Sequence, residues 1–258
     1  MFSLKTFMSN PKEQVTSIIR RGGLPKDQLL DAALNLIASE GYHRLTIERL
    51  AQRIGCSRTT LYKQADSSKA LMGQVALRTA ERLSIFLERI PKEQPSTRAE
   101  LWALVVAYEV FARCNSEDFA MHTLLGLPGL RTILADEDLE GLHGIRQKGL
   151  ERLTQVFLRA RVSGEFSSEV VGPPGELLAG LYAATTGFLQ QVALGHASIY
   201  TFELENPWES ALRSVNIYLD GLGWAPLSSD ADYFQLRWQV LVECFPEKLR
   251  ELGENHIP

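Results

Sequence analysis

The sequence predicts an all-α protein, with a small N-terminal domain followed by a larger helical remainder. Three observations predict this class. Apolar residues recur at spacings of three, four and seven in every periodic segment, which is the pattern of one helix face. No run alternates apolar and polar residues convincingly, as a half-buried strand would. Glycine and proline residues then separate the periodic segments, as they do between helices.

The expected architecture has three parts. Residues 1–23 form an arm, residues 24–90 form a three-helix domain of helix-turn-helix type with a long linker helix, and residues 91–258 form a larger helical domain. Residues 223–258 extend that larger domain by one more helix. The arm holds four basic residues and closes with Gly22-Gly23. It could add phosphate or minor-groove contacts, as basic arms do, or it could be a tail or a short accessory helix.

Residues 46–63 contain two short helices and a tight turn. Thr46 is predicted to cap the first helix, and Ser57 is predicted to cap the second. Gly55 ends the first helix, because glycine accepts the left-handed conformation that helix ends often need. The apolar face of the first helix is formed by Ile47, Leu50, Ala51 and Ile54. A helix, a Gly-containing turn and a second, polar and basic helix are the signature of a helix-turn-helix unit.

The second helix carries side chains of the kind that bind DNA. Arginine, lysine and threonine can read base edges in the major groove, and tyrosine and serine hydroxyls can hold phosphates. The residues that we expect to meet DNA are Thr46, Ser57, Arg58, Thr59, Thr60, Tyr62, Lys63 and Lys69. Two ordinary helices at a corner of an all-α domain could show the same turn. The basic cluster and the supporting helix over residues 24–42 favour DNA binding.

The same stretch contains a set of short motifs. After an amphipathic helix, the chain reads Glu40-Gly41-Tyr42, Leu45-Thr46-Ile47, Leu50-Ala51, Ile54-Gly55-Cys56-Ser57-Arg58 and Thr60-Leu61-Tyr62. With this set, residues 29–71 resemble the N-terminal domain of TetR-type transcriptional regulators. The resemblance implies double-stranded operator DNA as a partner, repression, a pocket for a small apolar effector, and a homodimer.

Two positions depart from the pattern of the family that the sequence resembles. The family usually has an aromatic residue three positions after the tyrosine, and this chain has Ala65 there. The family's phosphate-contacting lysine position holds Ser68, and Lys69 follows one residue late. We therefore expect a different phosphate clamp and different packing beneath the recognition helix.

The rest of the chain reads as a series of helices. Ser67 or Ser68 can cap a long helix that ends at Pro91 and links the two domains. Further helices are predicted over residues 100–114, 118–125, 139–162, 175–194 and 208–222, with one amphipathic helix in 230–252 carrying Phe234, Trp238, Leu241 and Phe245.

Charge is distributed unevenly along the chain. Residues 1–90 hold 14 Lys and Arg against 8 Asp and Glu, a balance of +6, whereas residues 91–258 hold 13 against 23, a balance of −10. A basic module attached to an acidic remainder suits a nucleic-acid-binding domain joined to a domain with another task.

Cys56, Cys114 and Cys244 are far apart and have neither metal-site nor redox spacing, so we expect small buried hydrophobes in a reducing compartment. The first residues contain no signal-peptide pattern. The most apolar long run, residues 177–195, is interrupted by threonine and glutamine and does not predict a membrane span. We expect a cytoplasmic protein without a membrane partner.

No catalytic, cofactor or metal site is predicted, because the sequence has no Gly-rich phosphate loop, no serine elbow and no Cys–His cluster. The acidic run Asp136-Glu137-Asp138 could hold a metal, but such a run at a helix start more often stabilises the helix dipole. Residues that could line an effector pocket are Trp102, Tyr108, Phe111, Phe119, His122 and Tyr182. Aromatic residues at helical spacing could equally be ordinary core.

A two-fold homodimer is expected, because one short recognition helix reads few bases and helix-turn-helix proteins pair to reach successive major grooves about 34–36 Å apart. Two stripes offer an interface: small residues at Ala179, Gly180, Ala183, Ala184 and Gly187, and larger ones at Trp208, Leu212, Val215 and Leu219. Paired across a two-fold axis, they would form a four-helix bundle. Both stripes could instead face the domain's own core.

The sequence thus predicts a DNA-binding transcriptional regulator, and the resemblance implies a repressor that a small apolar effector releases from its operator. The alternative is an effector-sensing or scaffold protein of the same fold that no longer binds operator DNA. Ala65 and Ser68 are the residues that keep this alternative open. An all-α enzyme would need a nucleophile–base pair or a metal set, and the sequence shows neither.

Overall fold

The computed structural model describes residues 24–166 and 172–253. Within these residues the chain forms helices and no strand, which confirms the predicted all-α class. The predicted N-terminal arm lies outside the described residues.

The described residues form two compact units. The first unit contains residues 24–78 and 124–140, and the second contains residues 79–123 and 141–253. This division differs from the predicted boundary at residue 90 in two ways. The boundary falls inside the long linker helix, and a segment from the middle of the chain groups with the N-terminal domain.

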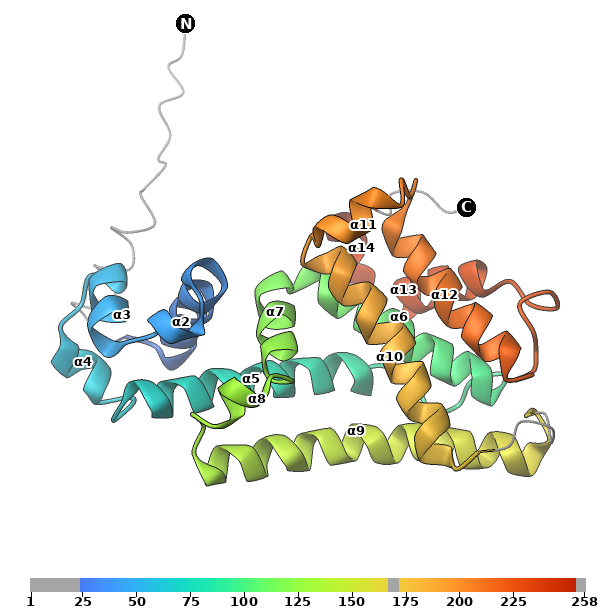
Figure 1. Cartoon of the computed structure of the whole chain (residues 1–258), viewed down its shortest axis with the longest axis horizontal. Coiled ribbons are helices and arrows are strands. Elements are labelled where there is room, and N and C mark those ends of the chain that lie inside the picture. The colour runs from blue at the N-terminus through green and yellow to red at the C-terminus, as the bar shows by residue number, and fades with distance from the viewer. Residues whose placement is uncertain (1–23, 167–171, 254–258) are drawn as a thin grey trace, which may run out of the picture. The chain divides into compact units, whose positions relative to one another are not determined.

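The first unit is built around the helix-turn-helix (Figure 1). Its elements are α2 Lys26–Glu40, η1 Tyr42–Arg44, α3 Ile47–Ile54, α4 Arg58–Tyr62, the first part of α5 Ser68–Glu88, α8 Pro128–Arg131 and the first turn of α9 Asp136–Ser163. Side chains from the helices fill its core, among them Leu29, Leu34, Leu50, Leu61, Leu71 and Val75. Helices α3, α4 and α8 are too short to be stable alone, so the shared core holds them in place.

Residues 124–140 are an integral part of the first unit. Leu130 is fully buried, and the hydroxyl of Tyr42 lies next to Gly129. The carboxylate of Asp138 lies against Gly73 so closely that a side chain at position 73 would overlap it. Pro128 begins the short helix α8 in this segment, because proline suits the first position of a helix.

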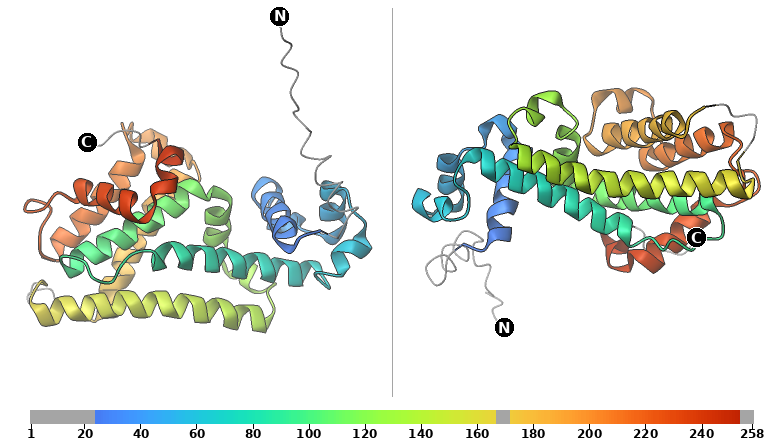
Figure 2. Two further views of the ribbon diagram at one scale, coloured as in Figure 1. Left: turned by 180° about the vertical axis from the view of Figure 1, so that it is seen from behind. Right: turned by 90° about the horizontal axis from the view of Figure 1, so that it is seen from below.

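The second unit surrounds one central helix, α6 Thr97–Cys114, whose residues 98–112 are all buried. Figures 1 and 2 show α6 between α10 on one side and α13 on the other. The remaining elements are the last part of α5, α7 Ser116–Leu124, most of α9, α10 Pro174–Ala193, α11 Ala197–Thr201, α12 Pro207–Gly221, α13 Tyr233–Cys244, η2 Pro246–Lys248 and α14 Leu249–Leu252.

The C-terminal extension is not the single helix that the sequence predicted. Helix α13 ends at Cys244, a short 3₁₀ turn begins at Pro246, and α14 follows. Proline lacks the N–H that the continuing helix would need, so the chain breaks there. Phe234 and Trp238 of the predicted apolar face are only half-buried. The core side chains of the extension are Trp224, Tyr233, Val240, Leu241, Phe245 and Leu252.

Three ionised side chains of α6 are buried and need partners from other elements. Glu109 is fully buried and pairs with Arg237 of α13 through two hydrogen bonds of 2.8 and 2.9 Å, and with Arg113 at 2.9 Å. Arg98 is also fully buried, and it pairs with Asp220 at 2.7 Å and donates to the backbone carbonyl of Trp224 at 2.6 Å. The two interactions of Arg98 fasten the end of α12 and the chain just after it to the central helix.

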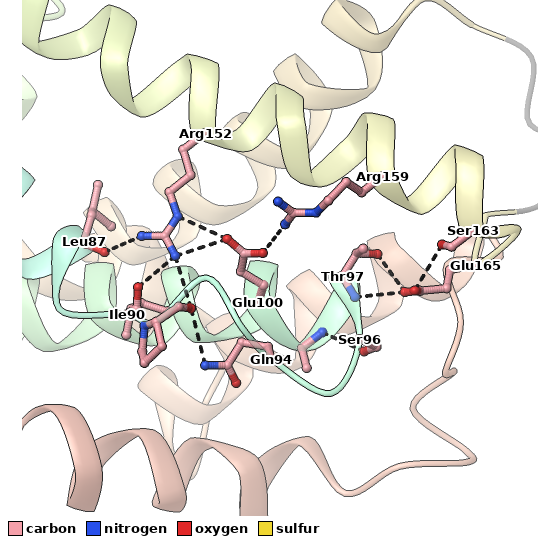
Figure 3. Close-up of polar contacts among 12 residues, drawn as sticks. Leu87, Ile90, Gln94, Ser96, Thr97, Glu100, Arg152, Arg159, Ser163 and Glu165 are labelled. Atoms are coloured by element: carbon pink, nitrogen blue, oxygen red, sulfur yellow. Dashed lines mark hydrogen bonds and ion pairs between the residues drawn. The ribbon is translucent and has the colours of Figure 1, made fainter.

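The third buried charge, Glu100, joins α6 to α9 (Figure 3). Arg152 and Arg159 of α9 both bind its carboxylate. Arg152 also donates to the carbonyl oxygens of Leu87 and Ile90, each at 2.9 Å. A single guanidinium therefore satisfies carbonyl groups at the end of α5 and a buried carboxylate at the same time.

The ion pair between Glu109 and Arg237 should dominate the attachment of the extension. Arg237→Ala leaves a buried carboxylate with only Arg113, and we expect the free energy of unfolding to fall by about 3 kcal/mol in urea titrations. The matched control is Arg213→Ala, which removes an exposed ion pair with Glu209 and a contact with the ring of Phe234, and should cost only about 1 kcal/mol. Equal losses in the two variants would contradict this assignment.

Candidate DNA-binding surface and effector site

The helix-turn-helix has the caps that the sequence predicted. The hydroxyl of Thr46 accepts the backbone N–H of Arg49 at 3.2 Å, and the hydroxyl of Ser57 accepts that of Thr60 at 3.2 Å. Gly55 adopts the left-handed conformation, with φ 79° and ψ 33°. The geometry of the turn is therefore fixed by local interactions of the residues that the motif contains.

The two departures at Ala65 and Ser68 have structural explanations. Ala65 is buried with 4% of its surface exposed, so the space beneath the recognition helix α4 is closed without an aromatic side chain. The hydroxyl of Ser68 accepts the backbone N–H of Ile47 at 3.2 Å, which ties the start of α5 to the start of α3. The sequence contains no signal for this bond, because it joins residues 21 positions apart.

The eight residues predicted to meet DNA lie at the surface of the first unit. Six of them are exposed, namely Ser57, Arg58, Thr59, Tyr62, Lys63 and Lys69, and Thr46 and Thr60 are half-buried. Thr46 and Ser57 act as caps, and the hydroxyl of Thr60 lies 2.9 Å from that of Ser57. The side chains that extend freely from α4 and its end are therefore Thr59, Tyr62 and Lys63.

Carboxylates near the motif form ion pairs with several of its arginines. The sequence pattern does not predict these ion pairs. Glu40 pairs with both Arg49, at 3.2 Å, and Arg53, at 3.3 Å. Glu48 lies 3.5 Å from Arg58 in an exposed pair. An exposed pair of this kind contributes little energy, so Arg58 can leave Glu48 for a phosphate or a base. Arg44 is a further exposed cation on this unit.

Comparison with known proteins agrees with this geometry. Residues 29–75 match the family described as bacterial regulatory proteins, tetR family. The N-terminal domain is a TetR-family domain. The match covers the helix-turn-helix together with the helices that support it.

Relatives and solved structures extend the TetR-family likeness. An uncharacterised HTH-type transcriptional regulator of Mycobacterium tuberculosis is 27% identical over 115 residues, 45% of this chain and 52% of that protein, so the match spans about half of the relative's length. A tetR-family regulatory protein from Rhodococcus RHA1 has a TM-score of 0.60 at 19% identity, covering 76% of this chain and 96% of that one. SmeT, the repressor of the Stenotrophomonas maltophilia multidrug efflux pump SmeDEF, has a TM-score of 0.56 at 19% identity, covering 76% and 89%. At these identities the solved structures show the fold alone.

The six residues predicted for an effector pocket do not share one environment. Trp102, Phe111 and Phe119 are fully buried in the core of the second unit. The indole N–H of Trp102 donates to the backbone carbonyl of Tyr233 at 2.8 Å, so Trp102 anchors the C-terminal extension. These three positions are explained by core packing.

Tyr108 and His122 do lie together. Their rings are 5.9 Å apart, and both pack against Phe119. Removal from water, with a further contribution from the charge of Arg146, lowers the pKa of His122 to about 4. The imidazole is therefore neutral near pH 7. Tyr182 of α10 is 58% exposed.

A surface cleft of about 380 Å³ occurs elsewhere in the second unit, and none of the six predicted residues lines it. Asn216 of α12 and residues 228–234 form its walls. The cleft is open, its walls combine polar and apolar side chains, and it lies beside the start of the C-terminal extension.

The predicted dimer stripes need correction. Leu212, Val215 and Leu219 are 0–1% exposed in the chain's own core, and Trp208 is half-buried there, so this stripe is not available to a partner. The exposed apolar residue of α12 is instead Ile217, at 71%.

The small-residue stripe of α10 is divided between two faces. Gly180 lies under Tyr218 of α12, whose hydroxyl donates to the carbonyl of Leu177 at 2.9 Å, so Gly180 serves packing within the chain. Ala184 and Gly187 are half-buried, whereas Ala179 and Ala183 are exposed.

The three cysteines are half-buried rather than buried as expected. Burial raises the pKa of Cys114 to about 11, so its thiol stays protonated near pH 7. In the described part of the chain, no helix combines the length and apolar character needed to cross a bilayer.

Ser68 and Lys69 should have separate roles at the DNA-binding surface. Ser68→Ala removes the acceptor for the Ile47 N–H and should lower the free energy of unfolding by about 1 kcal/mol, without changing the salt dependence of DNA binding. Lys69→Ala should leave the free energy of unfolding unchanged and flatten the salt dependence of DNA binding. An exposed lysine that meets one phosphate contributes about 0.9 to the salt slope. Urea titrations and binding measured at several salt concentrations test both. A flatter salt slope in Ser68→Ala would contradict the structural role.

Proposed function

We propose that the protein is a one-component repressor that binds operator DNA as a homodimer through the recognition helix α4. The observation that carries this proposal is the formed helix-turn-helix, in which Thr59, Tyr62 and Lys63 extend into solvent from a helix capped and anchored on its other side. The family match supports the same function. Because Ala65 and Ser68 now have packing and hydrogen-bonding roles, neither residue argues for a domain that has lost DNA binding.

For an effector to release the protein from its operator, a change in the second unit must reach the first unit through the chain segments that join them. In that unit, Asp118 of α7 accepts hydrogen bonds from Thr79 at 2.8 Å and Arg82 at 2.7 Å, both on α5. Helix α5 and the segment that follows α7 both continue into the first unit. An effector that binds one placement of α7 better than another would therefore shift the population of operator-binding conformations.

The two cations of the recognition helix should control DNA affinity. Lys63→Ala and Arg58→Ala should each flatten the salt slope by about 0.9 if the side chain meets a phosphate. Each should instead cost about 1–3 kcal/mol if it makes a bidentate base contact. Gel-shift titrations against the chain's own upstream DNA at several salt concentrations distinguish these outcomes.

The matched control for these variants is Lys148→Ala, which removes an exposed lysine of α9 in the second unit. It should leave both affinity and slope unchanged. Unchanged affinity and slope in Lys63→Ala and Arg58→Ala would overturn the proposed docking of α4.

The proposed dimer uses the outward faces of α10 and α12, which pack against each other within the chain. Ala179 and Ala183 are exposed on α10, next to Tyr182, and Ile217 is exposed on α12. Small residues allow two helices to approach closely, and Tyr182 and Ile217 supply apolar area. Helices that meet the same helices of a second chain form a four-helix interface.

Ala183→Glu should convert the dimer to monomers, because it places a charge in the apolar interface. Sedimentation velocity at micromolar concentration measures the change, and operator binding should be lost with it. Val162→Glu is the control, because Val162 is 90% exposed on α9 and lies outside the proposed interface. A wild-type monomer, or a dimer that survives Ala183→Glu, would contradict this interface.

A further inference from the structure

Two buried hydroxyl groups of the second unit have no hydrogen-bond partner. They are the phenol oxygen of Tyr108 on α6 and the hydroxyl oxygen of Thr185 on α10. Each residue has only 7% of its surface exposed. A buried hydroxyl without a partner costs free energy, since it has lost water and gained nothing in exchange. Such groups are rare enough in native structures to need an explanation.

Neighbouring hydroxyls show that the chain satisfies such groups elsewhere. Thr186 is as buried as Thr185, and its hydroxyl donates to the carbonyl of Tyr182, four residues earlier, at 2.7 Å. The hydroxyls of Thr123 and Thr154 use the carbonyl four residues earlier in the same way. Thr185 therefore differs from other helical threonines of the same unit in having no partner.

Tyr233 gives the corresponding comparison for Tyr108. Its hydroxyl donates to the carbonyl of Pro226 at 2.6 Å, although the residue is also buried. The two unsatisfied hydroxyls thus contrast with satisfied ones of the same chemical type and similar burial.

The surroundings of Tyr108 combine aromatic rings with polar groups. The ring of Tyr108 lies 5.5 Å from that of Phe119 and 5.9 Å from that of His122. Tyr108 is also close enough to Tyr182 for the two phenols to interact electrostatically. Thr185 follows Tyr182 by three positions and so lies on the same side of α10. Helices α6 and α10 pack against each other.

We propose that Tyr108 and Thr185 are the polar anchor of the effector site, and that the effector is an apolar molecule bearing an uncharged hydrogen-bonding oxygen. This inference rests on the proposed effector response. Both hydroxyls can donate and accept, so a ligand hydroxyl or carbonyl satisfies them. An apolar enclosure with a few convergent polar groups is the usual composition of a small-molecule site.

The charge of the site favours an uncharged ligand group. The imidazole of His122 beside Tyr108 is neutral near pH 7. Arg146 is the cation whose field reaches His122, and it already has an interaction partner of its own. A carboxylate ligand would lose its hydration without gaining a dedicated counter-charge.

The ligand enters by displacing side chains, because the two hydroxyls are closed off from solvent in this conformation. Binding then selects a more open arrangement of α6, α7 and α10. His122 is half-buried and Tyr182 is exposed, so these two side chains form the outer wall that moves. Helix α7, which carries His122, also carries the Asp118 that holds α5.

The first test measures stability without any ligand. Tyr108→Phe and Thr185→Val remove unsatisfied hydroxyls and keep the shape of the side chain, so the urea midpoint should stay the same or rise. The matched controls, Tyr233→Phe and Thr186→Val, remove satisfied hydroxyls, so the midpoint should fall. A fall in Tyr108→Phe and Thr185→Val equal to that in the controls would overturn the proposal, because it would show that the hydroxyls are already partnered.

The second test uses three probes with the same chain length: octan-1-ol, octanoate and n-octane. Octan-1-ol should raise the melting temperature of the wild type and of Thr186→Val, and the shift should be lost in the double variant Tyr108→Phe/Thr185→Val. Equal shifts with n-octane would exclude a polar anchor, and larger shifts with octanoate would exclude an uncharged group. No shift with octan-1-ol would also overturn the proposal. These measurements need no DNA. If the wild type fails to bind its upstream DNA in a separate gel-shift, that result refutes the proposed function and leaves the ligand measurements unaffected.

Discussion

The second unit depends on the burial of ionised side chains along α6. This helix is covered on all sides, and Arg98, Glu100 and Glu109 have at most 1% of their surface exposed. An isolated charge in such a place would cost several kcal/mol, so the surrounding elements must supply counter-charges. Helix α9 supplies two arginines, α12 supplies a carboxylate and α13 supplies an arginine. These ion pairs fasten α9, α12 and α13 to α6, whereas α10 packs against it through apolar side chains.

Helix α5 joins this arrangement to the DNA-binding unit. In the second unit its side chains are held at two places: Asp118 of α7 binds Thr79 and Arg82, and the C-terminal extension packs on its end through Phe86, which stacks on Phe245 at 5.5 Å. Arg89 lies over both of these rings. The extension is therefore part of the structure that positions α5. The proposed effector anchor acts on the other attachment, through α7.

Local signals allowed the DNA-binding unit to be predicted from the sequence. The caps at Thr46 and Ser57 and the left-handed Gly55 involve residues within a few positions of one another. The local sequence is therefore enough to predict the motif. The second unit depends on contacts between residues far apart in the sequence. Apolar periodicity shows which face of a helix is apolar, but it does not show whether the same chain or a second chain covers that face. Leu212, Val215 and Leu219 therefore looked like an interface although they face the core. The two hydroxyls of the proposed anchor carry no sequence signal at all, because only the packed structure shows that they lack partners.

Glu109 and Arg237 are made at different times during translation, which affects when α6 can be buried. The two residues are 128 positions apart, so at about 5–20 residues per second the ribosome makes Arg237 roughly 6–25 s after Glu109. Until then Glu109 has Arg113 as a partner but lacks the two hydrogen bonds from Arg237, so full burial of α6 is less favourable. A prematurely terminated chain would thus contain a complete helix-turn-helix and a less stable second unit. The C-terminal extension therefore makes the stability of the second unit depend on residues made as late as Arg237.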